Sequence, residues 1–265
     1  MQLESPQIIR IFCKLPLSFQ TIPIMCTVTF IKKGNNEFVL TSNRDETPNR
    51  VTLKPELYKV EGTAVLFPKD EKAGGTWIGI SDKNRTLCVL NGGFEYHKRK
   101  SNYRLSRGIV VKDLLISNNI YEAIDDYDLH DVEPFTLILV EYDPDLKLFE
   151  LVWDGSKTHL SELSTEPRIW SSSSLYSSEM KRERHKWFHD FKGSQELTAE
   201  SLLNFHKTAG EGNLEFGYLM DRGFVKTTSI TQIEKHADVL SMTFNDLKMH
   251  SFSTKSFKST QRIED

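Results

Sequence analysis

The hydrophobic pattern of this chain groups its strands into hairpins, and this grouping constrains the fold most. From Cys26 onward, CTVTFIK alternates with period two, KGNNE supplies turn residues, and EFVLTSN returns as a second strand. Later strand-like segments also follow one another, whereas helical spacing is confined to two blocks at residues 106–128 and 177–209. Because strands and helices do not alternate strictly, the order argues against a doubly wound parallel sheet. It predicts an α+β fold of antiparallel sheets covered by helices.

The composition bounds the class of protein. The chain has 265 residues and no Pro-rich, Gly/Ser-rich or low-complexity linker, so we expect a single domain over residues 25–265. A formal net charge of −3 without a concentrated Lys/Arg block argues against a nucleic-acid partner. The sequence contains no apolar run of about 18 residues, which predicts no integral membrane segment. Three cysteines without CxxC spacing fit a reducing compartment and predict a cytoplasmic protein.

The first 24 residues differ from the rest of the chain. They lack the basic start, continuous apolar run and small-residue cleavage site of a signal peptide. We therefore expect residues 1–24 to be a poorly ordered extension and Met25 to be the functional start.

The dipeptide Met25-Cys26 has two interpretations. A methionine before a small residue is normally trimmed, which would make Cys26 the first residue of the mature chain. Its thiol would then lie beside an α-amino group with a pKa of roughly 7.7–8.0, so that one residue supplies both nucleophile and general base. The alternative is an ordinary strand start.

The segment NRDE ends the strand that is expected to pair with the one starting at Cys26. In a hairpin, the end of the second strand returns beside the beginning of the first, so Arg44 and Asp45 are predicted to reach Cys26. Asp45 can hold or orient the α-amine, and the charge of Arg44 favours a thiolate. The alternative is a surface Arg–Asp pair of little energetic value.

Asn91 ends another strand in LNGGF, where an amide and backbone N–H groups can stabilise an oxyanion. The alternative is plain Asn-Gly turn chemistry. Neither GxGxxG nor GxxxxGK[ST] occurs, and we predict no cofactor. His185 and His189 have metal-ligand spacing but lack the Glu of HExxH and a third ligand, so we predict no metal site.

Four motifs in order, MCTVTF, TSNRDE, AGGTWIGIS and LNGGF, closely resemble the NRDE-motif proteins, the transport and Golgi organization 2 family. The resemblance runs from Met25 to about the final strand. It implies an N-terminal nucleophile (Ntn) hydrolase fold, a four-layer αββα sandwich of two antiparallel sheets between helix layers. Members of the family begin at the Met-Cys dipeptide, which also favours Met25 as the start.

The family is distantly similar to Ntn acylases that cleave non-peptide amides. By that resemblance Cys26 is the nucleophile, Asp45 and Arg44 steady it, and Asn91 helps to form the oxyanion hole. Those acylases carry a second Asn at the place where this chain has the serines around Ser173. They also carry a later Arg, for which the nearest candidate in this chain is Lys226. The residues assigned to substrate binding are Asn43, Trp77, Ser173 and Lys226.

The resemblance leaves two functions open. The first is a cysteine amidohydrolase acting on a linear amide of a small or lipid-like molecule. The second is a non-catalytic protein that binds and carries a hydrophobic ligand, a lipid or haem. The sequence does not separate them.

Overall fold

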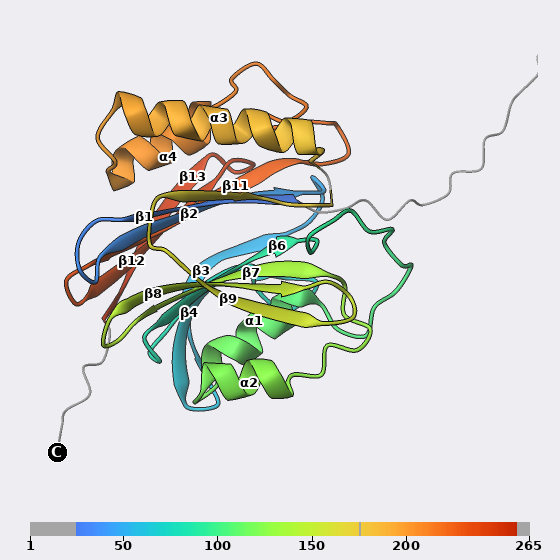
Figure 1. The fold of residues 1–265 in the computed structure, drawn as a ribbon, viewed down its shortest axis with the longest axis vertical. Coiled ribbons are helices and arrows are strands. Elements are labelled where there is room, and N and C mark those ends of the chain that lie inside the picture. Colours follow the sequence, from blue (N-terminus) through green and yellow to red (C-terminus); the bar gives the residue numbers. More distant parts are fainter. Residues whose placement is uncertain (1–24, 175, 259–265) are drawn as a thin grey trace, which may run out of the picture.

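The computed structural model describes residues 25–174 and 176–258. The predicted extension, residues 1–24, lies outside the described residues. The domain has four layers: a pair of helices, a six-stranded sheet, a seven-stranded sheet and a second pair of helices (Figure 1). The predicted α+β class and αββα arrangement are confirmed.

The six-stranded sheet is antiparallel and has the order β10-β1-β2-β11-β12-β13. The predicted hairpin occupies the second and third places in this order, and in it Cys26 is directly opposite Arg44. The strands are β1 (Met25–Lys32), β2 (Phe38–Glu46), β10 (Arg168–Ser171), β11 (Lys226–His236), β12 (Val239–Asp246) and β13 (Ser251–Lys258).

The seven-stranded sheet is a meander in which each strand pairs with the next along the chain. Its strands are β3 (Thr52–Val60), β4 (Thr63–Asp70), β5 (Ile78–Ser81), β6 (Arg85–Asn91), β7 (Phe135–Tyr142), β8 (Leu146–Trp153) and β9 (Thr158–Leu163). The pattern of the sequence predicts no strand for β3 or β9. Both are edge strands with mostly exposed or half-exposed side chains, so neither shows the alternation of a half-buried strand.

The helices form the two outer layers (Figure 1). Helices α1 (Arg107–Ile116) and α2 (Ile120–Asp126) cover the seven-stranded sheet, and α3 (Ser178–Ser194) and α4 (Ala199–Thr208) cover the other. Hydroxyl side chains cap the second pair, Ser177 on α3 and Thr198 on α4, which explains where these helices begin. No helix among residues 25–174 and 176–258 is long and apolar enough to cross a membrane.

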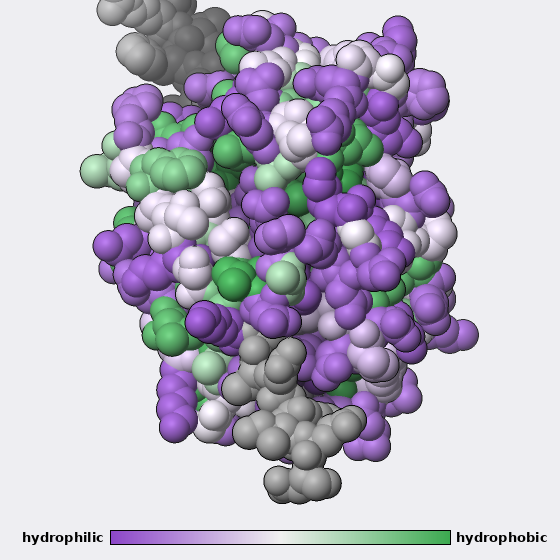
Figure 2. All heavy atoms as spheres, turned by 90° about the vertical axis from the view of Figure 1, so that its left-hand side faces the viewer, coloured by the Kyte–Doolittle hydropathy of each residue, from purple (hydrophilic) through white to green (hydrophobic). Residues whose placement is uncertain are grey.

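Strand alternation divides the buried side chains of β1 and β2 between two cores. Cys26, Val28 and Phe30 of β1 belong to the cluster between the sheets, whereas Ile31 and Val39 pack with α3 and α4. Adjacent residues of either strand therefore face different layers. Away from the cavity described below, the face at the left of Figure 1 carries small, separate apolar groups among polar side chains (Figure 2).

Candidate functional site

A cavity of about 260 Å³ opens between the two sheets beside the start of β1. Its walls come from β1, β2, the β4–β5 connection, the end of β6 and the segment leading into α1. Four of the eight residues predicted for the site line it: Cys26, Arg44, Trp77 and Asn91.

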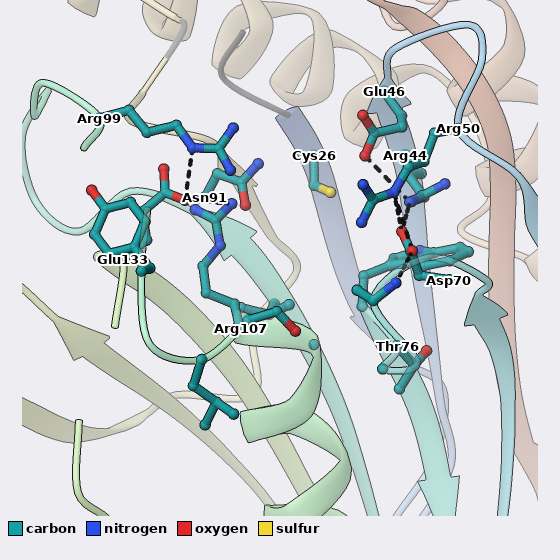
Figure 3. A pocket seen from close by; sticks show the side chains of 18 of the residues that line it. Cys26, Arg44, Glu46, Arg50, Asp70, Thr76, Asn91, Arg99, Arg107 and Glu133 are labelled. Atoms are coloured by element: carbon teal, nitrogen blue, oxygen red, sulfur yellow. Dashed lines mark hydrogen bonds and ion pairs between the residues drawn. The ribbon is translucent and has the colours of Figure 1, made fainter. Parts of the chain in front are cut away.

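Cys26 lies between the two walls of the cavity (Figure 3) and is 3 % exposed. Burial raises the pKa of its thiol well above the ordinary value, and Cys88 and Asp45 raise it further. The positive charges of Arg44 and Arg107 act in the opposite direction. With Met25 attached, the buried thiol is therefore in its neutral form near neutral pH.

One wall is organised around Arg44 and Asp70 (Figure 3). Arg44 Nη2 donates to Asp70 Oδ2 over 2.7 Å, and its Nη1 donates to Thr52 Oγ1 over 2.6 Å. The guanidinium carbon lies 4.4 Å from the centroid of the Trp77 ring, a cation–π distance. Arg50 Nε donates to the same Asp70 oxygen over 2.8 Å. Asp70 thus fixes two guanidinium groups in place.

The opposite wall is organised around Glu133 (Figure 3). Its Oε2 lies 3.3 Å from Arg107 Nη2 and 3.3 Å from Arg99 Nε. His97 Nε2 lies 3.4 Å from the other oxygen, Oε1. Glu133 and Arg107 are both largely buried, since 7 % and 10 % of their side chains are exposed. One carboxylate is therefore shared by two arginines.

Two glycines bring the first turn of α1 to the cavity. A Cβ at Gly75 would lie 2.3 Å from the carbonyl carbon of Gly108, so only glycine permits this approach. The N–H of Thr76 donates to the carbonyl of Gly108 over 3.1 Å. This contact brings Arg107, the first residue of α1, to the cavity wall.

Asp45 is beside Cys26 in the backbone, yet its side chain lies on the other face of the sheet. It accepts from Thr227 Oγ1 over 2.6 Å and from Tyr176 Oη over 3.2 Å. A β-bulge between Thr227 and Ser229 of β11 places the threonine hydroxyl there. Burial raises the pKa of Asp45 to about 6, although Thr227 and the charge of Arg184 oppose the increase.

Asn43 is on the same face as Asp45 and does not line the cavity. Its Nδ2 donates to the carbonyls of His206 and Tyr218 over 3.1 and 2.7 Å, and its Oδ1 lies 2.6 Å from His206 Nδ1. Asn43 therefore ties β2 to α4 and the segment after it. The structure gives it a position in the helix–sheet interface, away from the cavity.

Ser173 and Lys226 are also absent from the cavity wall. Ser173 Oγ donates to the carbonyl of Gly93 over 2.5 Å and accepts from Lys181 Nζ over 3.1 Å. Lys226 begins β11, opposite Glu46.

Asn91 differs from these residues because it lies at the cavity (Figure 3). Its backbone carbonyl accepts from Ser172 Oγ over 2.6 Å and from Ser173 N over 3.2 Å. The N–H of Gly92, which the sequence offers as an oxyanion donor, donates to the carbonyl of Pro134 over 3.0 Å.

Beyond the NRDE motif, which contains Arg44 and Glu46, the sequence interpretation missed five charged residues of the cavity. They come from irregular segments, a strand end and the first position of a helix, where hydrophobic periodicity carries no signal. The segment HKRK, residues 97–100, is the one local sequence signal of a basic wall, because it contains three Lys or Arg side chains in four residues. The residues are Arg50, Asp70, Arg99, Arg107 and Glu133.

A second hollow, a groove of about 1480 Å³, lies at the opposite end of β1 and β2. It is lined largely by turns, at residues 34–37, 82–85, 118–121 and 141–144. None of the described residues that line it is a cysteine, so the cavity at Cys26 is the better candidate for nucleophilic chemistry. Within the described residues, no group of three or more His, Cys, Asp or Glu side chains is arranged to hold a metal.

Two antiparallel sheets between helix layers give this chain an Ntn-hydrolase-like fold. The Caenorhabditis elegans orthologue of N-acylethanolamine-hydrolyzing acid amidase has this fold, with a TM-score of 0.54, 11 % identity and coverage of 79 % of this chain and 92 % of that chain. Penicillin V acylase from Agrobacterium tumefaciens gives a TM-score of 0.49 and 11 % identity, covering 89 % of this chain and 86 % of that chain.

The sequence profile described as Transport and Golgi organisation 2 matches residues 25–215. The chain belongs to this family, as the four motifs predict. None of the curated proteins matches the chain.

Proposed function

We propose that this protein is a cysteine amidohydrolase in the form whose chain begins at Cys26. The observation that carries the proposal is the juxtaposition at the start of β1. The Cys26 thiol faces the cavity opposite Arg44, and the backbone preceding it runs beside the buried carboxylate of Asp45.

The reaction needs a base for the thiol. In a chain that begins at Cys26, the α-amine takes the thiol proton as sulfur attacks the amide carbonyl. The tetrahedral oxyanion receives a hydrogen bond from the Asn91 amide. Its collapse breaks the C–N bond, and the α-ammonium returns its proton to the leaving amine. Water, deprotonated by the same α-amine, then hydrolyses the thioester and releases a carboxylic acid and the free thiol.

Arg44 and Asp45 act on different parts of Cys26. Arg44 lies on the thiol side, where its charge lowers the thiol pKa and counters the effect of burial. Asp45 lies on the other face, beside the strand start. A new ammonium at Cys26 would find there a carboxylate already oriented by Thr227 and Tyr176.

The cavity limits the size of the reacting part of the substrate. A volume of about 260 Å³ is below the usual range of drug-sized sites, roughly 300–1,000 Å³. Its walls carry charged residues at several positions. We therefore propose a small linear acyl amide in preference to a bulky apolar one.

The test compares the full chain with a form that begins at Cys26 after Met removal. Both are treated with butyryl p-nitroanilide, and the mass of the intact protein is followed. We expect a butyryl adduct on Cys26 and release of nitroaniline in the free-amine form alone, and neither in its Cys26→Ala variant. An absence of adduct and turnover from the free-amine form would refute this reaction for simple anilides, and equal acylation of both forms would show that the α-amine is not the base.

The second candidate function is ligand carriage without turnover. The burial and raised thiol pKa of Cys26 favour it for the chain that retains Met25. It predicts that ligand binding survives Cys26→Ala and that no acyl amide is cleaved.

A further inference from the structure

The wall formed by Arg99, Arg107 and Glu133 carries more positive than negative charge. Glu133 contributes one carboxylate to two guanidinium groups, and both contact the same oxygen at 3.3 Å. Charge-assisted N–H···O⁻ bonds usually measure about 2.7–2.9 Å. Arg44 and Arg50 reach Asp70 within that range, at 2.7 and 2.8 Å.

Arg107 differs from Arg44 in the quality of its contacts. Its Nη2 reaches Glu133 at 3.3 Å and its Nη1 reaches the carbonyl of Pro134 at 3.5 Å. Only 10 % of its side chain is exposed, and burial lowers its pKa. Arginine nevertheless stays protonated in proteins, so the cavity wall holds a desolvated cation with long, weak partners. An anion in the cavity would stabilise it.

The other residues of the cavity also favour an anionic ligand. Among the described residues that line it, four arginines stand against three carboxylates: Arg44, Arg50, Arg99, Arg107, and Glu46, Asp70, Glu133. The indole N–H of Trp77, a residue only 6 % exposed, has no hydrogen-bond partner among the described residues. A buried donor of this kind calls for a ligand or a water as acceptor.

We infer that Arg107 forms a carboxylate-binding subsite, so that the substrate is a small acyl amide that also bears a carboxylate. Cys26 lies between the Glu133 wall and the Arg44 wall (Figure 3), so a ligand anchored on Arg107 has its amide within the space that the thiol faces. The planar guanidinium fits a planar carboxylate. This inference specifies the substrate class of the proposed function, and it rests on that function in calling the ligand a substrate. Binding of a carboxylate at Arg107 does not itself require turnover.

The experiment measures binding with the full-length Cys26→Ala protein, which does not turn over. The probes are N-butyrylglycine, with its carboxylate on the amine half, and N-methylsuccinamate, with its carboxylate on the acyl half. N-butyrylglycinamide is the neutral control. We expect calorimetry to detect at least one of the two acids at millimolar concentration or below, to detect no comparable binding of the neutral amide, and to show weaker acid binding as salt increases.

Added substitutions locate the subsite. Arg107→Met is expected to weaken binding of the acid by about ten- to a hundredfold. Arg107→Lys keeps the charge and is expected to lose less. Arg182→Met, on the exposed surface of α3, is the matched control and should change nothing. Glu133 keeps Arg99 and His97 as partners in these variants, so the wall is not left with an unpaired carboxylate.

Three outcomes would overturn the inference: no binding of either acid, equal binding of the neutral amide, or equal losses in Arg107→Met and Arg182→Met. If Arg107→Met does not fold, the salt dependence and Arg107→Lys still decide. The proposed function fails separately. Acids that bind through Arg107 but are not cleaved by the free-amine form would support the subsite and refute the hydrolase. Cleavage of a neutral amide with the same kcat/KM as the matching acid would support the hydrolase and refute the subsite.

Discussion

Cys26 on β1 is directly opposite Arg44 on β2, and both side chains line the cavity between the sheets. Because opposite residues of an antiparallel pair share a face, this register alone places a guanidinium beside the thiol. Asp45, one residue further along β2, is placed on the other face by the same rule. The pairing therefore separates Arg44, which lies on the thiol side, from Asp45, for which we propose a role at the amine.

Arg44→Met should destabilise the protein by about 3 kcal/mol, because Asp70 and Glu46 lose a buried cationic partner. Lys54→Met removes an exposed ion pair with Glu56 and should cost much less than Arg44→Met. Urea denaturation measures both. In the folded Arg44→Met protein, alkylation of Cys26 by iodoacetamide should be slower, because Arg44 lowers the thiol pKa. Similar stabilities of the two variants would contradict the proposed importance of the Arg44–Asp70 pair.

Gly75→Ala should destabilise the protein by about 1–3 kcal/mol, because its Cβ would lie 2.3 Å from the backbone of Gly108. The first turn of α1 must then move and take Arg107 away from the cavity wall. Gly193→Ala in α3 meets no atom within 4 Å and should stabilise the helix by up to about 1 kcal/mol. Thermal melting of both variants tests the contrast, which fails if the two substitutions shift the melting temperature in the same direction.

Asp45 should make stability decrease as pH rises from about 4 to 6. Burial raises its pKa from 3.8 to about 6, so between these values the folded state holds a proton that the unfolded state has lost. The stability present below pH 3.8 is then lost as pH rises through 6, by about 3 kcal/mol in total. Asp45→Asn removes this dependence, so its stability relative to the full-length protein should rise over that interval. A constant difference from pH 4 to 7 would show that the carboxyl has an ordinary pKa.

The same measurement on a chain that begins at Cys26 tests the role proposed for Asp45. An ammonium beside the carboxylate lowers the pKa of Asp45, so the loss of stability between pH 4 and 6 should become smaller. If the pH dependence is identical with and without residues 1–25, the amine does not interact with Asp45.

His206 should have the opposite pH dependence. Its Nδ1–H donates to Asn43 Oδ1, its Nε2 accepts from Thr29 Oγ1 over 2.7 Å, and burial lowers its pKa to about 3. The stability it contributes is complete above pH 6.5 and is lost as pH falls toward 3. The cost of His206→Gln should therefore shrink by about 2 kcal/mol between pH 7 and 5, as measured by urea denaturation. A cost independent of pH would mean that His206 titrates normally.

Some of the site was accessible to sequence reasoning and some was not. The period-two pattern and the turn KGNNE determine that NRDE returns beside Cys26. The same alternation places Arg44 and Asp45 on opposite faces of β2. This consequence is easily overlooked when NRDE is treated as one motif. No local pattern indicates which face of β2 lines the cavity, because every residue of β2 is buried on one side of the sheet or the other.

The sequence by itself determined the α+β class, the order of strands and helices apart from the edge strands β3 and β9, and the hairpin that joins Cys26 to Arg44, because these depend on local periodicity and turn chemistry. Only the tertiary structure decided that Asn43 belongs to the α4 interface and that Arg107 and Glu133 form a cavity wall. These positions depend on how two sheets and a helix start pack together. The contact of Gly75 with Gly108 joins segments that are distant in sequence, and no pattern along the chain encodes a packing distance.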